Sequence, residues 1–158
     1  KTPKEKAQDQ AKPSAGTMVG DFSSTNKALS ISQNFELQGA DVIFPVAGGL
    51  GATTAENSLK SGKSVTIGVD ADFHLTAPQY DKVILISVLK GLSESVQAAV
   101  KEAYDGKFTN ALYVGTLKNK GVGLSPFYSP MKASISPKLI SELKDLQTNV
   151  AGGYISAK

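Results

Sequence analysis

The sequence predicts an α/β fold in which helices cover both faces of an open, mostly parallel sheet. Apolar runs of strand length alternate along the chain with segments of helical periodicity, and the connections between them are short. Parallel strands need crossover connections of this kind, and right-handed crossovers place helices on both faces of the sheet. The length of 158 residues suits one compact domain with a core of its own.

The chain divides into a short polar segment and one long lobe. Residues 1–16 are polar, contain two prolines and show no periodicity, so we expect a flexible arm or linker there. The alternation of strands and helices begins after this segment. We therefore expect residues 17–158 to form a single lobe.

The first half of this lobe contains three expected strands and two expected helices. Residues 23–26 (SSTN) are a typical helix start, and Gly39 and Gly62 are typical of helix ends. The strands are expected at residues 17–19, 41–45 and 64–69. The apolar helix positions expected to face the core are Ala28, Ile31, Phe35, Ala52, Ala55 and Leu59.

The second half repeats the pattern after an irregular connection at residues 71–82. Ser93 is a typical N-cap with Gly106 as the stop, and Ser136 is another, with proline at the first helical position. Strands are expected at residues 83–89 and 112–117, and an extended segment at 122–127. The apolar stripes of the two helices are Val96, Ala99, Val100 and Ala103, and Leu139, Leu143, Leu146 and Val150.

The composition excludes several kinds of site. The absence of cysteine excludes disulfides and thiolate chemistry, and a single histidine, His74, excludes a multi-histidine metal site. We expect His74 to be a surface residue. All 17 basic residues are lysines, and outside residues 1–16 they nearly balance the acidic residues, so we expect no nucleic-acid binding. No apolar run approaches the length of a membrane span.

Unusual residues stand where three of the expected strands end. A glycine-rich loop at residues 44–51 follows one strand, Asp70 closes the next, and Lys90 closes the third. In open α/β sheets ligands bind beyond the carboxyl ends of the strands, so these residues are candidates for a binding site. A carboxylate there can accept two hydrogen bonds from vicinal hydroxyls such as those of a ribose. A tight turn, a capping aspartate and a solvated lysine are the structural alternatives at these positions.

A dinucleotide-binding enzyme is the main rival interpretation from the residues. Gly49 and Gly51 follow a strand and open a helix, and Asp70 follows at nearly the usual distance. The third glycine of that fingerprint is replaced by Thr54, which weakens the match. Other catalytic patterns are poorer, because Ser87 and Ser125 lack a nucleophile elbow. Asp70 and Asp72 lack the spacing of a calcium loop, so we expect no metal.

Four segments in order carry a family resemblance. They are residues 39–51 (GADVIFPVAGGLG), 68–72 (GVDAD), 86–90 (ISVLK) and 121–127 (GVGLSPF). Together they closely resemble the basic membrane protein family of bacterial lipoproteins, which includes the purine nucleoside receptors. Residues 19–22 (VGDF) are similar to a Gly-Ser-Phe-x-Asp segment of that family, and the resemblance extends over residues 17–155.

The resemblance implies a function as well as a fold. Members have the type I periplasmic-binding-protein fold, in which two α/β lobes close on a ligand. They are lipoproteins anchored outside the bacterial cell membrane, and they deliver nucleosides to the permease of an ABC transporter. The resemblance therefore implies an extracytoplasmic nucleoside receptor, with purines favoured, that is not an enzyme and needs no cofactor. This chain corresponds to the C-terminal lobe, without the first lobe and its lipidated cysteine.

The resemblance also assigns the ligand-binding residues. The family's ribose-binding aspartate matches Asp70, and its lysine matches Lys90. The backbone of its Ala-Gly-Gly segment matches Ala47, Gly48 and Gly49. An aromatic residue that stacks on the base matches Phe44. The sequence departs from the family at Phe73, where a glutamine is usual, and at Pro45.

Three alternatives to a nucleoside receptor stay open from the sequence. One is a receptor of the same fold for a sugar or another small solute, because a fold does not fix its ligand. The second is the nucleotide-cofactor enzyme suggested by the partial fingerprint. The third is a surface-exposed lipoprotein that no longer transports a solute.

Overall fold

The computed structural model describes residues 16–156 and follows the expected alternation. Apart from Gly16, the expected arm at residues 1–16 lies outside the described residues. The longer helices are α2 (Thr25–Leu37), α3 (Gly51–Ser61), α5 (Leu92–Tyr104) and α6 (Pro137–Ala151). Short helical turns form η1 (Gly48–Leu50), α4 (Phe73–Thr76), η2 (Pro78–Val83) and η3 (Met131–Ser134). The strands are β1 (Val42–Ile43), β2 (Val65–Asp70), β3 (Ile84–Lys90) and β4 (Val122–Leu124).

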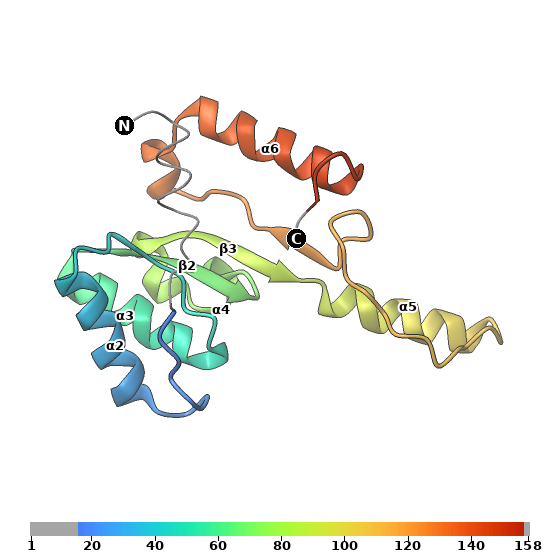
Figure 1. The fold of residues 1–158 in the computed structure, drawn as a ribbon, viewed down its shortest axis with the longest axis horizontal. Helices are drawn as coiled ribbons and strands as arrows, with labels where there is room; N and C mark the ends of the chain where they lie inside the picture. Colours follow the sequence, from blue (N-terminus) through green and yellow to red (C-terminus); the bar gives the residue numbers. More distant parts are fainter. Residues whose placement is uncertain (1–15, 157–158) are drawn as a thin grey trace.

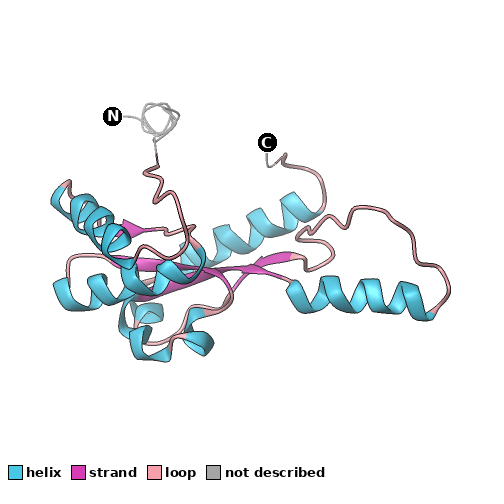
Figure 2. Cartoon of the chain, turned by 90° about the horizontal axis from the view of Figure 1, so that it is seen from below, coloured by secondary structure: helices cyan, strands magenta, loops and turns pink. Residues whose placement is uncertain are grey.

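The four strands form one open sheet in the order β1-β2-β3-β4. The first three are parallel, and β4 runs antiparallel to β3, with Val88 opposite Leu124 and Lys90 opposite Val122. Helical segments lie on both sides of the strands (Figure 2). The predicted α/β class, an open and mostly parallel sheet with helices on both faces, is confirmed.

Two expected strands do not form, and a third is shorter than expected. Residues 17–19 and 112–117 are not strands and pair with none of the four strands of the sheet. Leu112 is 89 % exposed, which fits an apolar segment without a neighbour. The strand expected at 41–45 is reduced to β1 at the sheet edge, because Pro45 has no N–H to donate.

The core forms between α3, the sheet and the 71–82 connection. Ala55 and Ile84 are fully buried there, and Phe73 packs against them. Gly62, in the left-handed conformation at φ 63°, ends α3 as predicted. The inward position expected for Leu59 is wrong: this residue is 39 % exposed, and Ser58 is buried in its place. Ser58 shares hydrogen bonds with the hydroxyls of Ser64 and Thr66, which explains a polar residue on the inward face.

Helices α5 and α6 form at the predicted positions but do not bury the predicted stripes. Figure 1 shows α5 extending beyond the end of the sheet, away from α2 and α3. Val96 and Val100 of α5 are each 62 % exposed, and Leu139 and Leu146 of α6 are also exposed. The helices predicted from the periodicity are therefore confirmed, while the burial predicted for their apolar stripes is wrong.

The excursion that contains α5 leaves and re-enters the sheet at two glycines. The N–H of Gly91, directly after β3, donates to the carbonyl of Gly121, directly before β4, over 3.0 Å. A Cβ at Gly91 would lie only 2.2 Å from the Lys120 carbonyl oxygen, so only glycine fits. None of the helices in residues 16–156 is long and apolar enough to cross a membrane.

Candidate functional site

Asp70 and Lys90 meet at the carboxyl edge of the sheet, as predicted from their places in the sequence. Asp70 ends β2 and Lys90 ends β3, and these strands are parallel neighbours. The Lys90 Nζ lies 2.6 Å from Oδ1 of Asp70. Among residues 16–156 this oxygen has no partner that meets hydrogen-bond geometry, so its contact with Lys90 is an ion pair. The Lys90 side chain is 61 % exposed, and exposed pairs contribute only about 0–1 kcal/mol to stability. The pair therefore contributes little to the stability of the fold.

Asp70 has an unusual backbone conformation for a residue with a side chain. Its φ is +70°, and the N–H of Ala71 donates to the carbonyl of Val69 over 2.9 Å. This is a γ-turn of the rare, strained kind, centred on Asp70. Such strain concentrates at binding sites, where the surrounding structure enforces it.

The loop after β1 brings a second group of candidates to the same edge of the sheet. Phe44 is 48 % exposed, and Ala47 leads into the helical turn η1, where Gly48 has φ 56°. A Cβ at Gly48 would lie 3.4 Å from the ring of Phe22, which reaches the loop from the segment before α2. Phe22 is 78 % exposed and was not among the sequence candidates. Its only signal in the sequence is its place in the VGDF segment.

A cavity of about 620 Å³ lies beside this loop. Apolar side chains from residues 16–22, α2 and β1 line most of it, with Phe22, Phe44 and Ala47 at the loop. Asp70, Lys90, Gly48 and Gly49 are not part of its lining. The structure thus gathers the predicted residues into two neighbouring groups, a charged pair and an apolar loop, rather than into one enclosed pocket.

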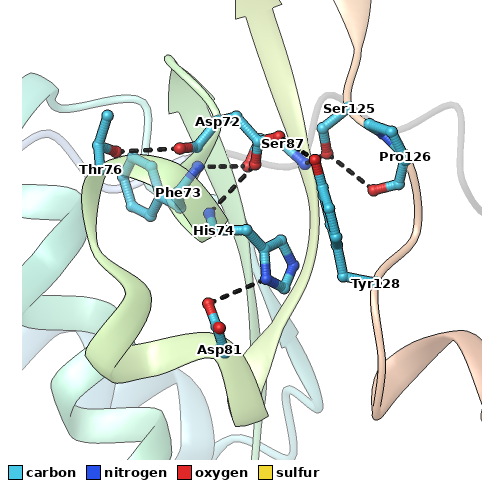
Figure 3. Close-up of polar contacts among 9 residues, drawn as sticks. All are labelled: Asp72, Phe73, His74, Thr76, Asp81, Ser87, Ser125, Pro126 and Tyr128. Carbon is cyan, nitrogen blue, oxygen red and sulfur yellow. Dashed lines mark hydrogen bonds and ion pairs between the residues drawn. The ribbon is translucent and has the colours of Figure 1, made fainter.

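Asp72, two residues after Asp70, is occupied by contacts within the fold. Its Oδ1 accepts the N–H of His74 over 3.1 Å, and its Oδ2 accepts the hydroxyl of Tyr128 over 2.8 Å (Figure 3). The bond to Asp72 raises the pKa of Tyr128, since it favours the protonated phenol, and burial adds to the shift. No group of three or more metal-ligating side chains occurs in the described part of the chain.

The prediction that His74 is a surface residue is wrong. The residue is only 8 % exposed, and its ring centroid lies 4.1 Å from that of Tyr128. Nδ1 lies 3.0 Å from Oδ1 of Asp81, as Figure 3 shows. Nε2 is buried and has no hydrogen-bond partner among residues 16–156. His74 therefore helps to pack Tyr128 and the 71–82 connection against each other.

Phe73, where the resembled family usually has glutamine, faces the core. A Cβ at Gly68 would lie 2.9 Å from its ring, and one at Gly51 would lie 3.0 Å away. The backbone N–H of Phe73 donates to Oγ of Ser87 over 3.0 Å. Phe73 thus packs beneath the sheet edge, where Asp70 and Lys90 form their ion pair. The Ser87 hydroxyl thus fixes the backbone of the loop that follows Asp70.

A model of one protein family matches most of the chain. It is described as ABC transporter substrate-binding protein, PnrA-like, and matches residues 15–151. The matched segment includes Asp70, Lys90 and the 44–51 loop. The family resemblance noted in the sequence is thereby confirmed.

Solved structures of similar fold come from several organisms. An ABC transporter solute-binding protein from Aeropyrum pernix K1 has a TM-score of 0.75 at 21 % identity over 89 % of this chain and 46 % of its own. One from Conexibacter woesei has a TM-score of 0.66 at 19 % identity, over 90 % and 45 %. A protein from Bacillus halodurans named as a transcriptional activator of the comK gene scores 0.73 at 18 %, over 88 % and 46 %.

These similarities show the fold alone, because all three sequence identities are below 25 %. The chain spans less than half the length of each of these proteins. The presence of a named transcriptional activator among them illustrates that this fold serves more than one function.

Proposed function

The chain belongs to the family of PnrA-like ABC transporter substrate-binding proteins, and from that premise we propose that it is one lobe of a nucleoside receptor. The family binds solutes and is not a family of enzymes, so the proposal assigns no catalytic residue. The solute would be a nucleoside, with purines favoured. The receptor would work outside the cytoplasm as a lipoprotein and pass its solute to the permease of an ABC transporter.

The observation that carries the proposal is the exposed ion pair between Asp70 and Lys90 at the sheet edge. The carboxylate can accept hydrogen bonds from the vicinal hydroxyls of a ribose, and the ammonium can donate one to a hydroxyl or a ring nitrogen. Two charge-assisted hydrogen bonds of about 1.5–3 kcal/mol each correspond to an affinity gain of about 100-fold or more. Phe44 and Phe22, at the loop of residues 44–51, would offer apolar ring faces to a base.

The remaining contacts would come from a second lobe outside this chain. Residues 1–16 would then be an arm or linker before the C-terminal lobe at 17–158. Two observations support a missing lobe: the chain spans less than half of its structural relatives, and the apolar stripes of α5 and α6 are uncovered. A ligand held between two such lobes is sequestered from water when they close.

Calorimetric titration of the complete polypeptide that carries this sequence tests the proposal. The panel consists of guanosine, inosine, adenosine, uridine, ribose, glucose and NAD. We expect submicromolar binding of at least one nucleoside and a loss of about tenfold or more in Asp70→Asn, since asparagine tolerates a positive φ and keeps the fold. Lys90→Met should also weaken binding, while Lys60→Met, which breaks an exposed pair with Glu56 on α3, should not.

Each other result has a defined meaning. Binding of a sugar but no nucleoside would make the protein a sugar receptor of the same fold. Binding of NAD alone would favour the nucleotide-cofactor interpretation. Nucleoside affinity unchanged within twofold in Asp70→Asn would contradict the assignment of the site.

A further inference from the structure

The strained turn at Asp70 needs an explanation from its surroundings. A γ-turn with positive φ persists only where neighbouring contacts fix it, because the backbone alone disfavours it. On one side Asp70 is held by the ladder, where it lies opposite Leu89 of β3. On the other side the chain enters residues 71–76, which are exposed at Ala71 and would be free to relax without further contacts.

Asp72 ties this loop to a distant part of the chain. Its side chain caps the short helix α4 through the N–H of His74 and accepts the Tyr128 hydroxyl with its other oxygen. Tyr128 belongs to the segment after β4 and lies 56 residues further along the chain. Figure 3 shows the Tyr128 side chain reaching from that segment to the loop that holds Asp72. Because both carboxylate oxygens are engaged, Asp72 holds the loop and is not a second ligand group.

Ser87 anchors the same loop from below. Its Oγ accepts the N–H of Phe73, and its own N–H donates to Oγ of Ser125 over 2.9 Å. The N–H of Ser125 returns to the Ser87 carbonyl over 2.9 Å. The loop after Asp70 is therefore fixed to β3 and to the segment after β4, and Tyr128 is held against it by the ring of His74.

We propose that Asp72 and Tyr128 are positioning residues for solute binding: their hydrogen bond holds the strained turn that places the Asp70 carboxylate at the carboxyl edge of the sheet. The proposal rests on the proposed role of Asp70 in binding ligand hydroxyls. It assigns Asp72 and Tyr128 no ligand contact. Loss of their bond should let residues 70–74 relax, so that fewer molecules present the carboxylate in its binding geometry.

Three variants and one control isolate this bond in the complete polypeptide. Tyr128→Phe removes the hydroxyl and keeps the ring against His74. Asp72→Asn keeps an oxygen for the α4 cap and removes the charge, and the double variant tests whether the two act together. Tyr154→Phe is the control, since this tyrosine follows α6 and is 83 % exposed.

Two readouts separate positioning from general stability. The first is affinity for inosine and for 2′,3′-dideoxyinosine, which lacks the hydroxyls that Asp70 would bind. The second, which needs no ligand, is amide hydrogen exchange at Ala71, Phe73 and His74. We expect each single variant to weaken inosine binding by about tenfold and to leave the dideoxy analogue nearly unchanged. The double variant should be no weaker than the weaker single variant, and exchange of the three amides should quicken by a similar factor.

The outcomes distinguish the positioning role from the proposed receptor function on which it rests. Inosine affinity within twofold of the wild type in Tyr128→Phe, with Asp70→Asn still impaired, would overturn the positioning role and leave the receptor function intact. Equal losses for both ligands would also overturn it, because a general structural defect does not discriminate between them. If the wild type binds no nucleoside, the proposed function fails. Amide exchange at Ala71 that is unchanged in the variants would then also refute the claim that the bond between Asp72 and Tyr128 fixes the turn. Faster exchange in the variants would support that claim.

Discussion

At the scale of single residues, Gly68 gives the sharpest test of the packing beneath the site. A Cβ at this position in β2 would lie 2.4 Å from Oγ of Ser87 and 2.9 Å from the ring of Phe73. Ser87 cannot turn away without losing its bond to the Phe73 N–H. We expect Gly68→Ala to lower the free energy of unfolding by about 1–3 kcal/mol, as measured by urea denaturation.

Gly123 of β4 provides a matched control for this substitution. A Cβ there would meet no atom within 4 Å, so Gly123→Ala should change stability by no more than about 0.5 kcal/mol. Equal effects of the two substitutions would mean that the contact between Gly68 and Ser87 is not present in solution.

The same residues show what sequence reasoning can find at this scale. Asp70 and Lys90 were identifiable because each ends an apolar run, and parallel strands bring such ends to one edge. Tyr128 and the burial of His74 were not identifiable. Their contacts join segments far apart in the sequence, and no local pattern distinguishes a tyrosine that reaches an aspartate from one that faces solvent.

At the scale of the elements, Glu36 joins α2 to the start of β2. Its Oε1 accepts the hydroxyls of Ser61 and Ser64, each over 2.7 Å. Burial raises the pKa of Glu36, but the hydrogen bonds from Ser64 and Ser61, together with Asn57 and the charge of Lys63, outweigh it, so the pKa lies below its ordinary value of 4.5. Because the folded pKa is lowered, this carboxylate stabilises the fold at neutral pH, and the contribution is lost as the pH falls through the folded pKa.

Glu36→Gln should therefore be destabilising in a pH-dependent way. We expect it to lower the free energy of unfolding at neutral pH, with the difference from the wild type narrowing as the pH falls below 4.5. Urea denaturation across this range measures it. Glu56→Gln on the exposed side of α3 is the control. A Glu36→Gln difference that stays constant with pH would show that the ionised carboxylate is not what the hydroxyls stabilise.

Elements were predictable where local chemistry defines them and not where a neighbour does. Helix α6 begins at Pro137 because Ser136 accepts the N–H of Leu139, and both features can be read from the sequence. The strands expected at 17–19 and 112–117 depend on a partner strand. Within residues 16–156 the sheet supplies none, so periodicity alone gave the wrong answer.

At the scale of the whole molecule, the uncovered stripe of α5 connects the fold to the proposed second lobe. Val96 and Val100 of this stripe, and Tyr104 one turn further along, lie on the same side of the helix, and all three are more than half exposed. The helix projects from the sheet (Figure 1). An apolar stripe of this kind needs a cover, which here would be the proposed second lobe.

The double substitution Val96→Glu and Val100→Glu tests that cover by comparing two polypeptides. In the chain of 158 residues it should change the unfolding free energy by no more than about 0.5 kcal/mol, because the stripe faces water. In the complete polypeptide it should cost several kcal/mol, roughly the price of burying unpaired charges, and weaken solute binding with it. Gln97→Glu adds a charge outside the stripe and should be tolerated in both.

Destabilisation of the short chain would show that the stripe packs within this lobe, and tolerance in the complete polypeptide would show that no second lobe covers it. Only the combination of a neutral short chain and a damaged complete protein fits a stripe that is buried between two lobes.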